Sequence, residues 1–380
     1  MLNIFINILL IFNTLQKSDV YFTKDITSKN IVNMFKKLDV KLEGKVGLKV
    51  HTGEIGGKYF LRPSFLQKIY DYTKGTFIEC NTAYLNYDRH TTEGHMRVLK
   101  ENGWLDDDRR MVIMDANPEN DKVIQIENPN NITENIVGEH LYDFDSCIVL
   151  AHFKGHAMGG FGGAMKQLSI GFASRAGKAN IHSGGFTTDF NQTWNHKASQ
   201  LNFTAAMADA ASTIVKYFRS KKGIVFINVL ANISTNCDCG RKAPEPRVRD
   251  IGILASTDPV AIDKACYDLI LKENTSGSND WKDWADERLA LNTLDVAEKL
   301  NIGTQDYNLI EVEFDDLWYV YYIIIPVGGV LIIGLIITLI VIKVKKGKKG
   351  KLLSENQDEN AELGSAVISR VESNWFLWYK

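Results

Sequence analysis

The residues best suited to chemistry lie in one glycine-rich stretch, HAMGGFGGAMKQLSIGFASRAGKANIH, at positions 156–182. A histidine stands at each end, His156 and His182, and Lys166 stands between them. Imidazoles suit proton transfer near neutral pH and are common metal ligands. The stretch therefore predicts a ligand or metal site. The alternative interpretation is tight strand-to-helix packing by the glycines, with Lys166 solvated and the histidines satisfied as ordinary polar side chains.

An apolar run at 147–153 precedes the glycines, and a helical pattern through Lys166 follows them. In an open α/β sheet, ligands bind outside the carboxyl ends of the strands, so this loop is expected to border a crevice. Gly160, Gly162 and Gly163 would let backbone amides approach a bound anion, and the N-terminus of the following helix favours negative charge. Neither a Walker motif nor a G-x-G-x-x-G fingerprint is present, so the glycines alone do not identify the ligand.

Short apolar runs alternate along the chain with segments of helical periodicity. Most runs lack clean two-residue alternation, as is expected of strands buried on both faces of a sheet. This order predicts an α/β fold with a mainly parallel sheet and flanking helices. The predicted strands are 46–51, 76–81, 111–115, 147–153, 223–230 and 251–256. The predicted helices are 31–38, 64–73, 92–102, 203–219, 259–271 and 286–300.

The chain of 380 residues is 45% apolar, which is enough to bury a substantial core. Its 44 Lys and Arg residues nearly balance 46 Asp and Glu residues, and a net charge of −2 argues against a nucleic-acid partner. Residues 319–342 carry no charge, are long enough to cross a bilayer as one helix, and are followed by lysines. We therefore predict a single-pass membrane protein with a disordered cytosolic tail at 343–380.

Residues 1–16 contain an apolar stretch typical of a secretory signal peptide. This segment predicts a lumenal or extracellular α/β domain at 17–318, whole or as two subdomains. The alternative is an ordinary N-terminal tail on a tail-anchored protein whose bulk is cytosolic. Glycosylation sequons fit a lumenal glycoprotein, although an asparagine-rich chain makes several by chance. The sequons lie at Asn131, Asn191, Asn202, Asn232 and Asn274.

Two of the five cysteines, Cys237 and Cys239, lie in a loop with the sequence NCDCG. Two thiolates at this spacing suit a soft metal ion, and the alternatives are a structural turn or a disulfide. The other cysteines, Cys80, Cys147 and Cys266, lie in predicted strands or a helix, where a thiol behaves as a small apolar side chain. An iron–sulfur cluster needs four cysteine ligands, and the chain has no C-x2-C-x2-C run, so no such cluster is expected.

Several segments between residues 20 and 312 resemble the domain-of-unknown-function family 362. They include VGLKVHTGEIGGKYFLRP, AHFKGHAMGGFGGAMKQLSIGFASRAGK and DIGILASTDPVAIDKAC. Many relatives carry an inserted ferredoxin-like module with two iron–sulfur clusters. This chain departs from them, because residues 186–222 contain no cysteine. The family has no settled activity, so the resemblance implies a fold and leaves the reaction open.

The glycine-rich stretch also resembles the nickel-pincer lactate racemase family in the order and spacing of its histidines, glycines and lysine. The resemblance implies that Lys166 tethers a nickel-pincer nucleotide, His182 ligates nickel and His156 is one acid/base residue. The second acid/base histidine of that family precedes an arginine. Here Arg89 is present, but Asp88 stands where the histidine would be. His95 or His90 would have to take its place.

These observations lead to a functional hypothesis and one alternative. The hypothesis is a racemase or epimerase of 2-hydroxy acids, in which a nickel-bound cofactor accepts a hydride, a histidine takes the hydroxyl proton and Arg89 holds the substrate carboxylate. The alternative is a non-catalytic module, displayed on a membrane, that binds a small anion or a metal ion, with Cys237 and Cys239 contributing to the metal site.

Overall fold

One mixed sheet runs through the centre of the protein, which we describe from a computed structural model covering residues 17–106, 109–237 and 244–314. The sheet has eight strands. All neighbouring pairs are parallel except those that β11 makes with β1 and β10. In sheet order the strands are β12 (Tyr307–Glu311), β1 (Ser18–Thr23), β11 (Gly252–Ser256), β10 (Ile224–Leu230), β7 (Ser146–His152), β2 (Val46–Lys49), β3 (Thr76–Glu79) and β4 (Met111–Ile113).

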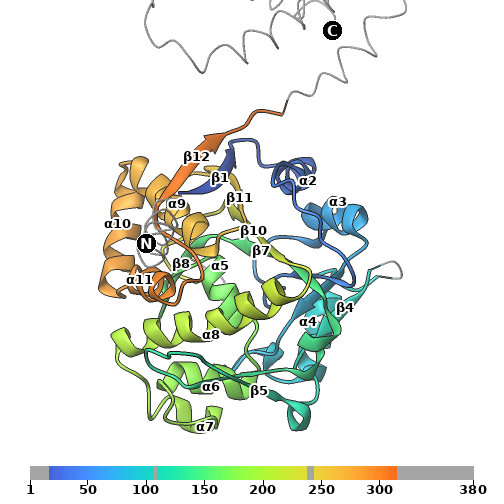
Figure 1. The fold of residues 1–380 in the computed structure, drawn as a ribbon, viewed down its shortest axis with the longest axis vertical. Coiled ribbons are helices and arrows are strands. Elements are labelled where there is room, and N and C mark those ends of the chain that lie inside the picture. Colours follow the sequence, from blue (N-terminus) through green and yellow to red (C-terminus); the bar gives the residue numbers. More distant parts are fainter. Residues whose placement is uncertain (1–16, 107–108, 238–243, 315–380) are drawn as a thin grey trace, which may run out of the picture. The chain divides into compact units, whose positions relative to one another are not determined.

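Helices cover both faces of this sheet, as Figure 1 shows for α2 and α3 to the right and α9, α10 and α11 to the left. The first face carries α2 (Ser28–Lys37), α3 (Pro63–Thr73) and α4 (Thr92–Glu101). The second carries α5 (Ala164–Lys166), α8 (Gln200–Ser220), α9 (Pro259–Lys272), α10 (Ser276–Glu287) and α11 (Asn292–Lys299). Smaller elements are α6 (Arg175–Ser183), α7 (Phe190–Thr193), and the pairs β5 (Lys122–Gln125) with β6 (Glu134–Val137) and β8 (Lys154–His156) with β9 (Gly160–Gly162).

Strand β10 explains why the central runs read as continuously apolar. Every residue of the strand is buried. Val225 and Ile227 point into the core beneath α2 and α3. Ile224 and Phe226 point into the core beneath α8 and α9. Because both faces of the strand are covered, no polar residue is needed at alternate positions. The prediction of an α/β fold with a mainly parallel sheet and flanking helices is therefore confirmed.

Each predicted strand matches an observed strand to within a few residues. Each predicted helix up to residue 271 likewise matches an observed helix. The predicted helix at 286–300 is confirmed over Asn292–Lys299 and wrong as one continuous helix. The chain ends one helix at Glu287 and begins the next at Asn292. Between them Leu289 adopts the left-handed region with φ 47°, which is incompatible with a continuous helix.

No helix within the described part of the chain is long and apolar enough to cross a bilayer. The predicted signal peptide at 1–16, the span at 319–342 and the tail at 343–380 all lie outside the described residues. They therefore stay predictions.

Candidate functional site

A cavity of about 380 Å³ opens where parallel strands of the sheet end. His51 and Glu54 follow β2, Cys80 and Thr82 follow β3, and Lys154 follows β7. The position agrees with the rule that open α/β sheets bind ligands outside the carboxyl ends of their strands. The cavity brings together most of the site residues predicted from the sequence, namely Arg89, His156, Gly162, Gly163, Lys166, His182 and Cys237.

Lys166 stands at the end of the short helix α5. Asp263 fixes this helix, because its two carboxylate oxygens accept hydrogen bonds from the backbone amides of Ala164 and Met165 at 2.8 Å each. Among the described residues none accepts a hydrogen bond from the Lys166 amine. Burial, reinforced by the charges of Lys49 and Arg89, lowers the pKa of Lys166 to about 7. A large fraction of this amine is therefore neutral and nucleophilic at neutral pH.

The two histidines present opposite hydrogen-bonding groups to the cavity. His156 Nδ1 accepts from the backbone amides of Met158 and Gly159 at 3.3 and 3.0 Å, so its proton belongs on Nε2. His182 Nδ1 lies 2.7 Å from the Lys178 carbonyl oxygen, so the ring proton of His182 belongs on Nδ1. Its Nε2 is therefore unprotonated and can accept a hydrogen bond or ligate a metal ion. Burial holds the pKa of His156 well below 6.5 and lowers that of His182 to about 4. Both rings are neutral at pH 7.

Lysines give the cavity an excess of positive charge. Lys154 and Lys178 line it together with Lys166. The Lys154 amine lies 3.6 Å from Cys237 Sγ, and the Lys178 amine donates to the Ala173 carbonyl oxygen at 2.5 Å. Burial, followed by the charge of Lys166, holds the pKa of Lys154 well below 10.5. A bound anion would relieve this repulsion, so the cavity is suited to anionic ligands.

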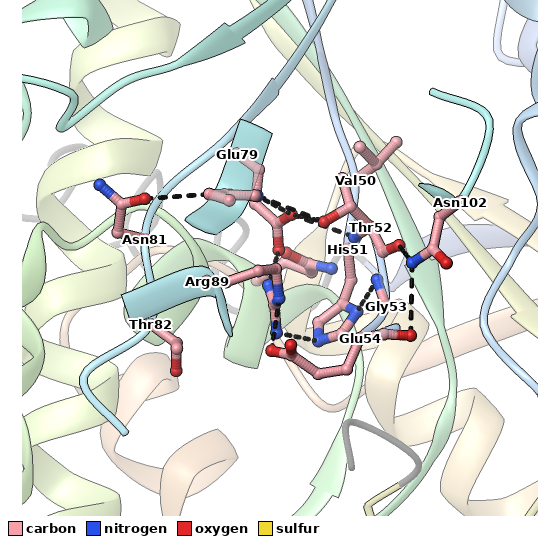
Figure 2. A network of polar contacts seen from close by, with 12 residues as sticks. Val50, His51, Thr52, Gly53, Glu54, Glu79, Asn81, Thr82, Arg89 and Asn102 are labelled. Atoms are coloured by element: carbon pink, nitrogen blue, oxygen red, sulfur yellow. Dashed lines mark hydrogen bonds and ion pairs between the residues drawn. The ribbon is translucent and has the colours of Figure 1, made fainter. Parts of the chain in front are cut away.

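Arg89 is already paired with two buried carboxylates, as Figure 2 shows. Its Nε donates to Glu54 Oε1 at 2.7 Å and its Nη1 donates to Glu79 Oε1 at 2.8 Å. Its Nη2 lies 3.3 Å from His51 Nε2. Burial alone would raise the pKa of Glu79, but Arg89 and His95 hold it well below 4.5. A bidentate grip on a ligand carboxylate, as predicted for Arg89, requires the arginine to release one of these partners.

His95 does not reach the cavity surface. It is fully buried on α4, where its Nε2 lies 3.3 Å from Glu79 Oε2 and its Nδ1 lies 3.0 Å from Asn81 Oδ1. The residue predicted as a second acid/base group therefore lies behind Glu79 and supports that carboxylate. Its position follows from helical periodicity, because Val98 and Leu99 on the same helix are also buried.

The three glycines predicted to bind a cofactor, Gly160, Gly162 and Gly163, differ in how closely other atoms pack against them. Gly160 has φ 75°, and a Cβ there would lie 2.4 Å from Ala290 Cβ, beside α10 and α11. A Cβ at Gly163 would lie 2.4 Å from Asp263 Oδ1. A Cβ at Gly162 would meet only the Lys166 side chain, at 3.5 Å, and the Lys154 carbonyl oxygen, at 4.0 Å. Close packing explains Gly160 and Gly163, and of these three glycines Gly162 and Gly163 line the cavity.

This difference gives a matched pair of variants. Gly160→Ala should lower the free energy of unfolding by about 2 kcal/mol or more, because it adds a clash to a left-handed backbone. Gly162→Ala should change it by less than about 1 kcal/mol, because the new methyl group meets an ordinary contact. Denaturant unfolding of both variants measures the difference. A loss in Gly160→Ala as small as that expected for Gly162→Ala would show that Gly160 is not a packing position.

The predicted metal site at His182, Cys237 and Cys239 stays a prediction, and among the described residues alone no three His, Cys, Asp or Glu side chains gather in a way that could hold a metal ion. Cys237 is disulfide-bonded, so a thiolate ligand at this position requires reduction. Cys239 lies outside the described residues.

Sequence reasoning missed His51, Glu54 and Glu79 as members of the site. The signal was present, because His51 and Glu54 lie in the segment HTGEIGG directly after a predicted strand, as the glycine-rich stretch does. Applying the strand-end rule to every parallel strand would have brought these residues into the prediction.

Comparison with known proteins adds a family and a distant fold likeness. A family model described as "Domain of unknown function (DUF362)" matches residues 46–268. No curated protein matches the chain. A crystal structure of a protein from Thermotoga maritima has 13% identity and a TM-score of 0.38, covering 72% of this chain and 58% of that one. The lactate racemase apoprotein from Thermoanaerobacterium thermosaccharolyticum has 12% identity and a TM-score of 0.38, covering 66% of this chain and 57% of that one. The chain thus spans less than two thirds of either structure.

Proposed function

The chain belongs to the family described as domain of unknown function DUF362, and from this premise we propose that its cavity is the active site of an isomerase acting on small 2-hydroxy acids. The observation that carries the proposal is the meeting of three groups in one buried cavity. They are an amine without a hydrogen-bond partner among the described residues, an imidazole N–H and an imidazole lone pair. The surrounding lysines attract a carboxylate.

The residues present fit the cofactor that the resemblance to nickel-pincer lactate racemases implies. Lys166 would hold the nucleotide, because burial lowers the pKa of its amine to about 7 and the amine has no hydrogen-bond partner among the described residues. His182 would ligate the metal through Nε2, because the Lys178 carbonyl fixes the ring through Nδ1, as outer partners of metal-bound histidines do. When bound, such a cofactor supplies an acceptor for the hydride of the substrate C–H bond.

The chain's own residues have distinct tasks in this proposal. The lysines bind the substrate carboxylate, and His156 donates a hydrogen bond from Nε2 to a substrate oxygen. Because its pKa lies well below 6.5, His156 is a weak base and stays neutral in the absence of ligand. A separate group must then accept the hydrogen bond of the substrate hydroxyl and take its proton when the hydride leaves the carbon.

A non-catalytic anion-binding module is the second candidate. One observation favours it, namely that Glu54 and Glu79 already occupy Arg89. An arginine closed on two carboxylates is less available to orient a substrate for reaction. This candidate keeps the anion-binding cavity and omits the covalent use of Lys166.

The test is an analysis of full-length protein isolated from its own host. We expect peptide mass spectrometry to find a covalent adduct on Lys166, with nickel in equal amount, and the protein to interconvert the two enantiomers of lactate. The adduct should disappear in Lys166→Arg and persist in Lys100→Arg, whose side chain is exposed on α4. Metal without an adduct and without turnover would support the binding module instead. Absence of adduct, metal and turnover would overturn the isomerase.

A further inference from the structure

Glu54 has one carboxylate oxygen whose partner is missing from the described protein. The residue follows β2 and lies between Gly53 and Gly56, which both have positive φ angles, 75° and 81°. Its side chain is only 1% exposed, and Oε1 accepts the hydrogen bond from Arg89 Nε at 2.7 Å. The other oxygen, Oε2, is buried and has no hydrogen-bond partner among the described residues. Figure 2 shows this carboxyl group turned toward Arg89 beside the His51 ring.

A buried carboxylate oxygen without a donor is costly, and native proteins seldom leave one unpaired. Glu54 lines the cavity, so a donor can come from a bound ligand. Glu79, by comparison, is satisfied from the protein, because Thr52 donates to its Oε2 from both the backbone amide and the hydroxyl. Of the two cavity carboxylates, Glu54 and Glu79, Glu54 is therefore the one with an oxygen that lacks a hydrogen-bond donor among the described residues.

We propose that Glu54 is a specificity-determining residue whose Oε2 accepts a hydrogen bond from the ligand's hydroxyl group. The inference rests on the proposed function, in which the Nε2 lone pair of His182 ligates the metal, and it names the acceptor that the other histidines do not supply. His95 cannot take this role from behind Glu79, and His156 presents an N–H.

The charge of the cavity selects a hydroxyl over an ammonium as the donor. Lys154, Lys166 and Lys178 line the same cavity, and each of these amines that is protonated repels a cationic group. A hydroxyl donates a hydrogen bond without adding charge, while the ligand carboxylate lies against the lysines. The ligand class is therefore a small acid with a hydroxyl group near its carboxylate.

The first test needs no variant. The full chain is titrated by calorimetry at pH 7 with lactate, with propionate, which lacks the hydroxyl, and with alanine, which replaces it by an ammonium. We expect lactate to bind at least about tenfold more tightly than propionate, as a hydrogen bond to a charged acceptor implies. Alanine should bind most weakly. Equal affinity for lactate and propionate would overturn the role of Glu54 alone, whereas failure of both acids to bind would overturn the proposed function with it.

The second test assigns the discrimination to this side chain. Glu54→Gln keeps a carbonyl oxygen for Arg89 Nε and places an amide N–H where Oε2 was. The ratio of lactate to propionate affinity should fall at least about threefold, since the amide N–H cannot accept the hydrogen bond that the ligand hydroxyl donates to Oε2. Glu101→Gln, an exposed position at the end of α4, should keep the wild-type ratio. An unchanged ratio in a Glu54→Gln protein with a normal unfolding transition would refute the assignment.

Discussion

Replacing Arg89 with methionine is expected to lower the free energy of unfolding by about 3–5 kcal/mol, the usual result of removing one partner from a buried ion pair. The guanidinium is the shared partner of Glu54 and Glu79, and the side chains of all three residues are at most 6% exposed. Methionine would fill most of the volume but leave two carboxylates without their cation. Denaturant unfolding at pH 7 measures the loss.

The pH dependence of this loss identifies its cause. Arg89 and His95 hold the folded-state pKa of Glu79 well below 4.5, so Glu79 contributes stability above about pH 4.5 and loses it as the pH falls through the folded-state value. Without Arg89, burial would raise that pKa, and protonation at low pH would relieve the penalty. The deficit of Arg89→Met should therefore be largest above pH 5 and shrink toward pH 3. Arg97→Met, at a side chain that is 70% exposed, should show no such deficit. A deficit independent of pH would point to packing.

The central strands could be predicted from the sequence because burial on both faces makes them continuous apolar runs. The edge strand β12 could not, because its residues are only half-buried or exposed and its sequence YNLIE mixes polar and apolar residues. β12 is held by its pairing with β1, in which Ser18 is opposite Tyr307. That pairing joins the two ends of the described chain, and no local sequence pattern predicts it.

The break between α10 and α11 shows a second limit. The segment 286–300 is predicted as one helix, and its second part is helical, with Leu294 and Ala297 buried on α11. The turn at Leu289 brings Ala290 against Gly160, whose missing side chain leaves room for it. A contact between residues so far apart in the sequence overrides the local helix propensity.

The candidate site was predictable where chemistry and spacing coincide in one segment. Lys166, His156 and His182 share one glycine-rich stretch and line one cavity. The cluster of Glu54, Glu79 and Arg89 was not predictable in this way. Its residues come from three separate segments, which only the sheet order brings together. The tautomers of His156 and His182 depend on nearby backbone amides and carbonyls, and the positions of these groups cannot be predicted from the residue types.

Replacing Lys166 with methionine should weaken lactate binding at least about tenfold at pH 7 while making the protein more stable. In protein that carries no adduct on Lys166, the protonated amine supplies positive charge to a bound carboxylate, and charge-assisted hydrogen bonds are about twice as strong as neutral ones. In the free protein the same amine is destabilising, because its folded-state pKa of about 7 lies far below its ordinary value of 10.5. Since one pKa unit corresponds to about 1.4 kcal/mol, we expect a gain of a few kcal/mol at neutral pH.

The gain in stability of Lys166→Met should depend on pH, because the native and unfolded states of the wild type bind the Lys166 proton with different affinities. Between pH 7 and 10.5 the unfolded chain holds the Lys166 proton more tightly than the native protein, so wild-type stability should rise with pH through this site. Methionine removes this dependence, and the gain should vanish above pH 10.5. Lys100→Met, at an exposed position, should alter neither binding nor the pH profile. Weaker binding with lower stability in Lys166→Met would assign the side chain to packing. The expected pattern would mark it as a group that lowers the stability of the free protein and serves the ligand.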